Sequence, residues 1–249
     1  MSAPKNFTHK KKGIRRQLLQ KVEIQGSKNV VSKEVYLNDF ERLNLATRGL
    51  VEIIPSDEHK VIIETDDNLM EYFEISSTAN TLYVNVDEKH ARPMYTQLTI
   101  KIYVKQVTSI YSTGKAYIHT VSALTVNGPV GIKMLGEGSG MLYIQAATLV
   151  LVREGSGRLA LKGKCTTFDI VNAGDGKLAC REMEANILLL NNKGNGKTEV
   201  YARHQFSVKN HANAVITCYG PAKHRDLMNY GEGQIVAGEL PVKESEVNQ

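Results

Sequence analysis

The chain has 249 residues, with six prolines, 20 glycines and no tryptophan, a composition typical of a soluble β protein rich in turns. No stretch approaches the roughly 18 apolar residues that a membrane-spanning helix needs, and no basic segment followed by an apolar one marks an export signal in these residues. The net charge of +5 is unevenly spread, because residues 1–21 carry seven basic and no acidic side chains, while the remainder has a charge of −2.

Residues 1–21 are expected to form a basic flexible tail, because they show no sustained hydrophobic period. Two interpretations stay open for it: a solvated terminus, or an arm that binds a polyanion. No RNA-binding aromatic motif accompanies the basic residues, so a nucleic-acid partner is not expected. Residues 239–249 are polar and aperiodic and are expected to form a second, C-terminal tail.

Between the tails, residues 22–238 are expected to form one domain whose first half, 22–121, is irregular. Residues 60–65 read as a strand, 68–74 as either a helical turn or a strand, and 88–94 as a loop. Leu43 is followed ten residues later by Ile53, a step that recurs downstream and indicates that coiling begins here. The half is either a wider part of one solenoid or a separate β layer that caps it.

The second half, residues 122–238, repeats a small-residue triplet. Its copies lie at 138–140, 155–157, 174–176, 194–196, 212–214 and 231–233, at intervals of 17, 19, 20, 18 and 19 residues. A period of about 20 residues is the signature of a solenoid. Glycine in the triplet suits either a positive φ or a close backbone approach.

Pairs of apolar residues two apart flank each triplet, and such pairs mark the buried face of a strand. Leu142 follows the first triplet, Leu159 the second and Leu178 the third, with equivalent residues before each; only Arg225, before the last triplet, breaks the rule. Each repeat therefore contains two short strands, too close together for a crossover helix. The predicted fold is all-β: a right-handed, single-stranded parallel β-helix with coils of about 17–20 residues.

Asparagines and cysteines occupy further columns of this arrangement. Asn172, Asn192, Asn210 and Asn229 each stand four residues before the end of a triplet, which predicts a ladder of stacked amides. Cys180 and Cys218 share an inward column two coils apart, so about 9–10 Å separates them and no disulfide is expected. Cys165 is placed in a turn.

Short motifs in both halves resemble a known family. They are the runs at 30–31, 39–40, 49–53, 56–58 and 64–69, and the Gly-Ser-Gly repeats at 138–140 and 155–157. Together they resemble the putative auto-transporter adhesin, head GIN domain family, over residues 26–238. The resemblance implies a bacterial right-handed β-helix at an extracellular, cell-surface or periplasmic location, of unknown specific function. It supplies no catalytic residues, and no cofactor is expected.

Because the inward columns are apolar, any site is expected on outward positions or turns. One predicted outward column holds Arg158, Lys177 and Lys197, and a second holds Lys162, Arg181, Tyr201 and Tyr219. Such a basic face with aromatic edges suits an acidic glycan, because Arg and Lys pair with carboxylates or sulfates and Tyr stacks on sugar rings. The alternative is that these side chains only keep the solenoid soluble.

The turns offer one candidate for catalysis. Glu137 and Glu154 are expected in the same turn position one coil apart, at roughly 5 Å, the carboxylate separation of retaining glycosidases. The competing interpretation is a pair of solvated glutamates. His204 and His224 are expected on adjacent coils without a third ligand, so no metal site is predicted.

The leading hypothesis is a non-enzymatic surface protein that binds a glycan or a cell-surface protein through the basic face. The first alternative is a glycosidase that uses Glu137 and Glu154, and the second is a scaffold whose basic tail, 1–21, binds a polyanion. Pairing of two copies by their faces or their open ends would give a homo-oligomer.

Overall fold

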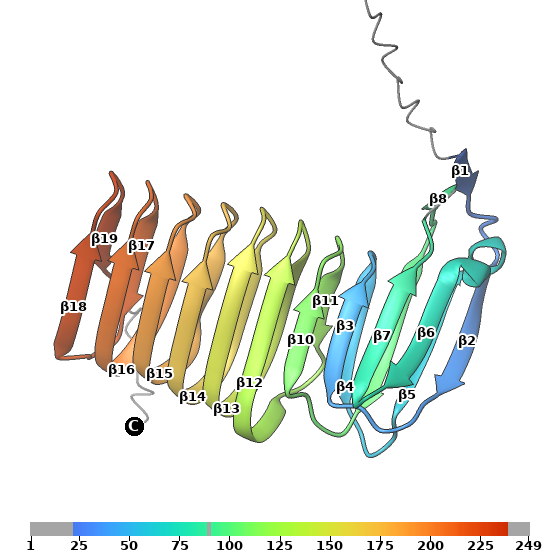
Figure 1. Cartoon of the computed structure of the whole chain (residues 1–249), viewed down its shortest axis with the longest axis horizontal. Helices are drawn as coiled ribbons and strands as arrows, with labels where there is room; N and C mark the ends of the chain where they lie inside the picture. The colour runs from blue at the N-terminus through green and yellow to red at the C-terminus, as the bar shows by residue number, and fades with distance from the viewer. Residues whose placement is uncertain (1–21, 89–90, 239–249) are drawn as a thin grey trace, which may run out of the picture.

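A computed structural model describes residues 22–88 and 91–238. The predicted fold class is confirmed: 67% of the structure is strand and 3% is helix, and the chain winds as a parallel β-solenoid of about six turns. Figure 1 shows the coils side by side in a row, from β18 (His224–Asn229) and β19 (Gln234–Ala237) at one end to β2 (Val30–Tyr36) and β6 (Phe73–Thr78) at the other.

Long parallel strands build the regular half: β12 (Leu124–Leu135), β13 (Ser139–Glu154), β14 (Leu159–Asn172), β15 (Leu178–Asn192), β16 (Thr198–Asn210) and β17 (Val215–Tyr219). Each strand from β13 to β15 continues from one triplet turn, around a bend, to the next turn. The two short strands expected in each repeat are therefore the two ends of one bent strand. Register shifts at the bends, such as the one between Ala160 and Lys162, absorb the variable spacing.

The bent strands give the solenoid three sides. The first side contains the strand ends that precede each turn (130–135, 149–154, 168–172, 188–192), and the second side contains those that follow it (140–142, 159–161, 178–180). The third side is narrow and contains the residues at the bends of the strands (124–126, 144–146, 163–165, 183–185). We call this third side the corner. Leu142, Leu159 and Leu178 all point into the core, with at most 1% of each side chain exposed.

The first triplet turn differs from its predicted position. A Cβ on Gly155 would lie 1.9 Å from the carbonyl oxygen of Gly136, so the turn lies two residues before the expected 138–140. Ile132 accordingly pairs with Leu151. Because side chains alternate along a strand with a period of two, this two-residue shift leaves the same residues facing inward.

The predicted asparagine ladder is confirmed. The side-chain amide of Asn172 donates to the Oδ1 atom of Asn192 at 2.7 Å, that of Asn192 to Asn210 at 2.9 Å, and that of Asn210 to Asn229 at 2.9 Å. Asn172, Asn192 and Asn210 are fully buried. The ladder therefore satisfies polar groups that would otherwise be buried without partners, and it ties successive coils together.

The irregular half contributes β3 (Arg42–Ala46), β4 (Leu50–Pro55), β5 (Lys60–Asp66), the 3-10 helix η1 (Asp67–Tyr72), β7 (Thr81–Val86), β9 (Leu98–Val104), β10 (Ser109–Ser112) and β11 (Tyr117–Thr120). Residues 68–74, expected to form either a helical turn or a strand, are therefore helical as far as Tyr72, and β6 begins at Phe73. β3 and β4 form a coil, as the ten-residue step predicts, and they stack on β10 and β11.

The coils of this half do not stack in chain order. β7 pairs with β3, and β9 pairs with β4, on the side away from β10 and β11. In Figure 1 the blue strands β3 and β4 consequently lie between green and teal strands that come later in the chain. Beyond them, β5 runs antiparallel to both β9 and β2, and β6 runs antiparallel to β7, so this end of the solenoid is closed by antiparallel strands.

The opposite end is open. β18 pairs with β16 and β19 pairs with β17, and within residues 22–88 and 91–238 no strand is paired with their outer edges. Leu227, at an inward position of β18, is 40% exposed. The last coil therefore covers the core of the preceding one but has no cover of its own.

Two local expectations are wrong. Part of the expected loop 88–94 forms β8 (Ala91–Met94), which pairs in parallel with β1 (Val22–Gln25) as a separate two-stranded sheet. Pro93 is tolerated there because such a pair has free edges. Cys165 lies in β14 at the corner and not in a turn. All three cysteines are buried and free, as expected for Cys180 and Cys218.

Candidate binding surface

A hollow of about 330 Å³ lies on the second side, and we call it the basic hollow. It is lined by four cationic side chains (Arg158, Lys162, Lys177, Arg181), two acidic ones (Glu182, Glu199) and the apolar residues Met141, Ala160, Leu161 and Ala179. Four of the seven residues proposed from the sequence thus line one depression, whereas Lys197, Tyr201 and Tyr219 do not line it.

The first proposed column follows the coils. The amide of Leu159 donates to the carbonyl of Lys177, and the amide of Leu178 donates to the carbonyl of Lys197. These bonds place Arg158, Lys177 and Lys197 in three successive coils. Arg158 and Lys197 are exposed, whereas Lys177 is half-buried.

The second proposed column, which was expected to begin with Lys162 beside Arg181, is wrong for these first two residues. A register shift between Ala160 and Lys162 places Lys162 opposite Glu182, not opposite Arg181. The cause is a bulge, in which β15 uses one residue more than β14. Farther along, Tyr201 does lie opposite Tyr219. The aromatic residue that contacts a lysine of the hollow is instead Tyr143, whose ring centre lies 5.0 Å from the Lys162 ammonium.

Sequence reasoning missed Glu199, which occupies the outward position between the two basic columns. Its carboxylate lies 3.2 Å from the Lys177 ammonium and 3.0 Å from that of Lys197, and 9% of its side chain is exposed. Burial raises the pKa of Glu199, but the two lysines outweigh burial and hold this pKa below its usual value. Lys177 and Lys197 are therefore partly neutralised, whereas Arg158 and Arg181 are exposed.

A larger hollow of about 590 Å³ runs along the corner, and we call it the corner groove. It is lined by Thr125, Val126, Asn127, Gln145, Ala146, Ala147, Lys164, Cys165, Thr166, Glu184, Asn186 and Arg203. None of these residues was a sequence candidate for binding. The signal available in the sequence is an apolar residue at each bend with polar neighbours on both sides, except at Ala146, which is followed by Ala147. This pattern becomes visible only once the register is known.

The glutamate pair does not form the expected arrangement. Glu154 pairs in register with Leu135, and Glu137 makes an ion pair at 2.7 Å with Lys115. The cause is again the shifted first turn. The carboxylate pair of a retaining glycosidase is therefore not assembled from these residues.

The histidine positions give no metal site in the described part of the chain. His224 lies opposite Gln205, one residue from His204. Within residues 22–88 and 91–238, no cluster of three or more His, Cys, Asp or Glu side chains could hold a metal ion. Among the same residues, no helix is long and apolar enough to cross a membrane.

Comparison with solved structures supports the architecture. A putative adhesin from Bacteroides fragilis matches with a TM-score of 0.79 at 21% identity, covering 86% of this chain and 99% of that one. A putative lipid binding protein from Parabacteroides distasonis matches with a TM-score of 0.72 at 18% identity, covering 87% and 100%. A putative adhesin from Parabacteroides merdae matches with a TM-score of 0.63 at 15% identity, covering 88% and 100%. At these identities the likeness shows the fold alone.

Comparison of sequences gives the family. No protein with a curated description matches the chain. A family model matches residues 39–222, which include the first coil, the closed end apart from β2, and nearly all of the regular coils. The chain therefore belongs to the putative auto-transporter adhesin, head GIN domain family.

Proposed function

We propose that this protein is a non-enzymatic bacterial surface protein, extracellular or periplasmic, that binds an acidic glycan in the basic hollow. The observation that carries the proposal is the gathering of four cationic side chains, from two neighbouring coils, around one depression with a partly apolar floor. The family, whose name describes adhesins, supports a surface location and a binding role.

The chemistry of the hollow favours anionic groups. Glu182 and Glu199 offset two of the four positive charges, so a net positive charge remains. Arg158 and Arg181 are exposed, and a guanidinium pairs with carboxylate or sulfate through two parallel hydrogen bonds. Ala160 and Ala179, which pair in register, give the hollow an apolar surface on which a sugar ring can lie.

The test is a double substitution, Arg158→Gln with Arg181→Gln, measured on sulfated and uronic-acid glycans. It leaves both lysine partners of Glu199 in place, so the buried carboxylate keeps its ion pairs. We expect binding to weaken at least about tenfold, since hydrogen bonds to charged groups contribute roughly 1.5–3 kcal/mol each. Binding by the natural protein should also weaken with added salt.

The matched control is Lys193→Gln with Lys209→Gln, which removes two exposed charges outside the hollow. Net charge falls equally in both variants, so a general attraction to polyanions would weaken equally in both. Equal affinities of the two variants would therefore remove the basic hollow as the site. The basic tail remains a separate proposal, because residues 1–21 lie outside the described part of the chain.

A further inference from the structure

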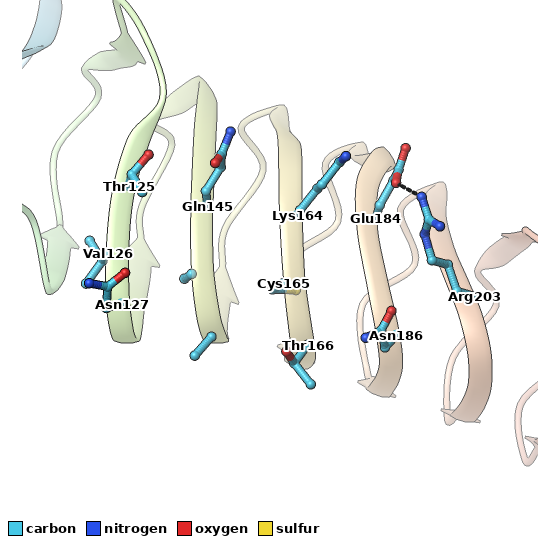
Figure 2. A pocket seen from close by; sticks show the side chains of 12 residues that line it. Thr125, Val126, Asn127, Gln145, Lys164, Cys165, Thr166, Glu184, Asn186 and Arg203 are labelled. Atoms are coloured by element: carbon cyan, nitrogen blue, oxygen red, sulfur yellow. Dashed lines mark hydrogen bonds and ion pairs between the residues drawn. The ribbon is translucent and has the colours of Figure 1, made fainter.

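The corner groove is straight because equivalent residues of successive coils pair in register. Thr125 pairs with Gln145, Gln145 with Lys164, and Lys164 with Glu184, so equivalent polar side chains follow one another along the solenoid axis. Figure 2 shows this row along one edge of the groove, continued by Arg203. The spacing between members is that of neighbouring strands, about 4.7–4.9 Å.

The floor is concave because the residues at the bend are small and face inward. Val126, Ala146, Cys165 and Ala185 pair in one column, and all but Ala146 are buried. The residues before and after this column face outward and diverge on its two sides. The result is a shallow trough whose floor consists of backbone and small side chains.

The opposite edge of the groove is polar without charge. Asn127, Thr166 and Asn186 lie along it, below the floor residues in Figure 2, and Ala147 interrupts this polar row. On the first edge, Glu184 makes an ion pair with Arg203 and stands in register beside Lys164, so two positive charges face one negative charge and a single positive charge remains. The amide of Gln145 is oriented by a 3.4 Å hydrogen bond to the hydroxyl of Tyr143.

These features select a class of ligand. Amides and hydroxyls on both edges (Asn127, Thr166 and Asn186 on one, Thr125 and Gln145 on the other) match a flat polymer that carries hydroxyl groups on both of its edges. One remaining positive charge in a groove that spans β12 to β16 does not require an anionic ligand. A peptide strand is disfavoured, because the backbone groups of the coils are already paired with neighbouring coils and cannot add a strand.

We infer that the corner groove binds a neutral, extended polysaccharide that lies parallel to the solenoid axis across β12 to β16. This site is distinct from the basic hollow in position and in the charge of its ligand. Because no aromatic side chain among residues 22–88 and 91–238 lines the groove, affinity comes from hydrogen bonds repeated from coil to coil. It should therefore rise with chain length until the polymer spans the groove.

The experiment is calorimetric titration of the full chain with neutral oligosaccharides of increasing length, from the ribbon-like glucan, xylan and mannan series. The test variant is Gln145→Ala with Asn186→Ala, which removes one amide from each edge. We expect about a tenfold or greater loss of affinity, because each neutral hydrogen bond contributes roughly a two- to tenfold factor. The control, Gln205→Ala, removes an exposed amide outside the groove and should bind as the natural protein does.

The outcomes separate this inference from the proposed function. Loss of neutral-glycan binding in the groove variant, with acidic-glycan binding retained, supports a second site. The inference is overturned if none of the three series binds the natural protein, or if the groove variant and Gln205→Ala bind equally well. It is also overturned if Arg158→Gln with Arg181→Gln abolishes neutral-glycan binding, because both ligands would then share the basic hollow.

Discussion

Arg153 occupies the position of the asparagine ladder in the coil before Asn172. Only 3% of it is exposed. Its guanidinium donates at 3.0 Å to the Oδ1 atom of Asn172 and at 3.0 Å to the carbonyl of Gly176, and it also donates to the carbonyl of Gly157. Burial lowers the pKa of Arg153, but arginine remains charged in proteins. One side chain thus ends the ladder and joins two turns.

The substitution Arg153→Met keeps the length of the side chain and removes its donors. It leaves three acceptors without their partner, and a buried unsatisfied group costs about 1–3 kcal/mol. We expect the free energy of unfolding to fall by about 3 kcal/mol, which lowers Tm by about 6–12 °C in a domain of this size. Thermal unfolding followed by circular dichroism measures this, with Arg158→Met as the exposed control. Equal Tm values for the two variants would contradict the role of Arg153.

Because the pKa of Glu199 is lowered in the folded protein, we expect the stability of the fold to depend on pH. Burial opposes its charge, yet the pKa of Glu199 lies below its usual value because of Lys197 and Lys177. A carboxyl with a lowered folded-state pKa stabilises the fold above its unfolded pKa of about 4.3, and this contribution disappears as pH falls through the folded value. We therefore expect Glu199→Gln to have a lower Tm than the natural protein at neutral pH.

The effect of Glu199→Gln on stability should disappear in acid. Once Glu199 is protonated it resembles glutamine, so the difference in Tm should begin to shrink as pH falls below the unfolded pKa of about 4.3 and should approach zero below the lowered folded-state pKa. Glu232→Gln, at an exposed turn position, serves as the control and should change Tm little at any pH. A difference for Glu199→Gln that persists unchanged in acid would show that shape, and not charge, decides the effect.

At the scale of the element, the triplet turns are fixed by backbone contact. A Cβ on Gly194 would lie 2.1 Å from the carbonyl oxygen of Gly174, and one on Gly174 would lie 2.5 Å from that of Gly155. Positive φ occurs in these turns only at Gly155. Glycine is therefore required in most turns because neighbouring coils touch there.

The substitution Gly194→Ala should accordingly destabilise the protein by about 1–3 kcal/mol, the usual cost of overpacking. The obstacle is backbone, which cannot move without changing the spacing of the coils. Gly128→Ala is the matched control, because a Cβ there meets no atom within 4 Å. Urea unfolding midpoints compare the two, and a Gly194→Ala midpoint equal to that of Gly128→Ala would refute the contact argument.

The same elements show how far a sequence pattern reaches. Apolar alternation predicts which side chains face inward, so Leu159 and Leu178 are placed correctly. It cannot detect a register shift of two residues, because such a shift preserves alternation. The displaced first turn and the pairing of Glu154 with Leu135 were therefore missed. Bulges have no sequence signature of comparable strength, so Lys162 was placed beside the wrong residue.

At the scale of the whole molecule, the order of stacking was also beyond the sequence. The excursion from Pro55 to Ser109 supplies β7 and β9, which obey the same periodicities as β3 and β4. Periodicity says that two strands face the same core but not which of them is outermost. The antiparallel strands β2, β5 and β6 settle the order here, because they close one end.

The two ends should therefore differ in stability. In a solenoid each coil contacts only its neighbours, so an uncovered terminal coil opens at lower cost than an inner one. All six residues of β18 are exposed, whereas β14 and β15 bury alternate side chains. Hydrogen exchange should be fastest in β18 and β19 and slowest in β14 and β15. Uniform protection along the solenoid would contradict this gradient.

Arg225 limits this opening. It takes the inward position that apolar residues hold in other coils, and its guanidinium lies 5.8 Å from the ring centre of Phe206. It also donates to the carbonyls of Ala222 at 2.9 Å and Gly220 at 3.2 Å. The guanidinium of Arg225 thus lies over Phe206 at the open end, while the side chain as a whole stays exposed to water.

The substitution Arg225→Ala should uncover Phe206 and speed hydrogen exchange in β16 and β17, which lie directly beneath the last coil. Exchange in β13 should not change, because several coils separate it from the open end and coupling is limited to neighbours. Arg158→Ala, which removes an arginine from the second side, provides the comparison. Faster exchange along the whole solenoid would mean that the coils unfold as one unit, and unchanged exchange in β16 would mean that Arg225 does not protect the end.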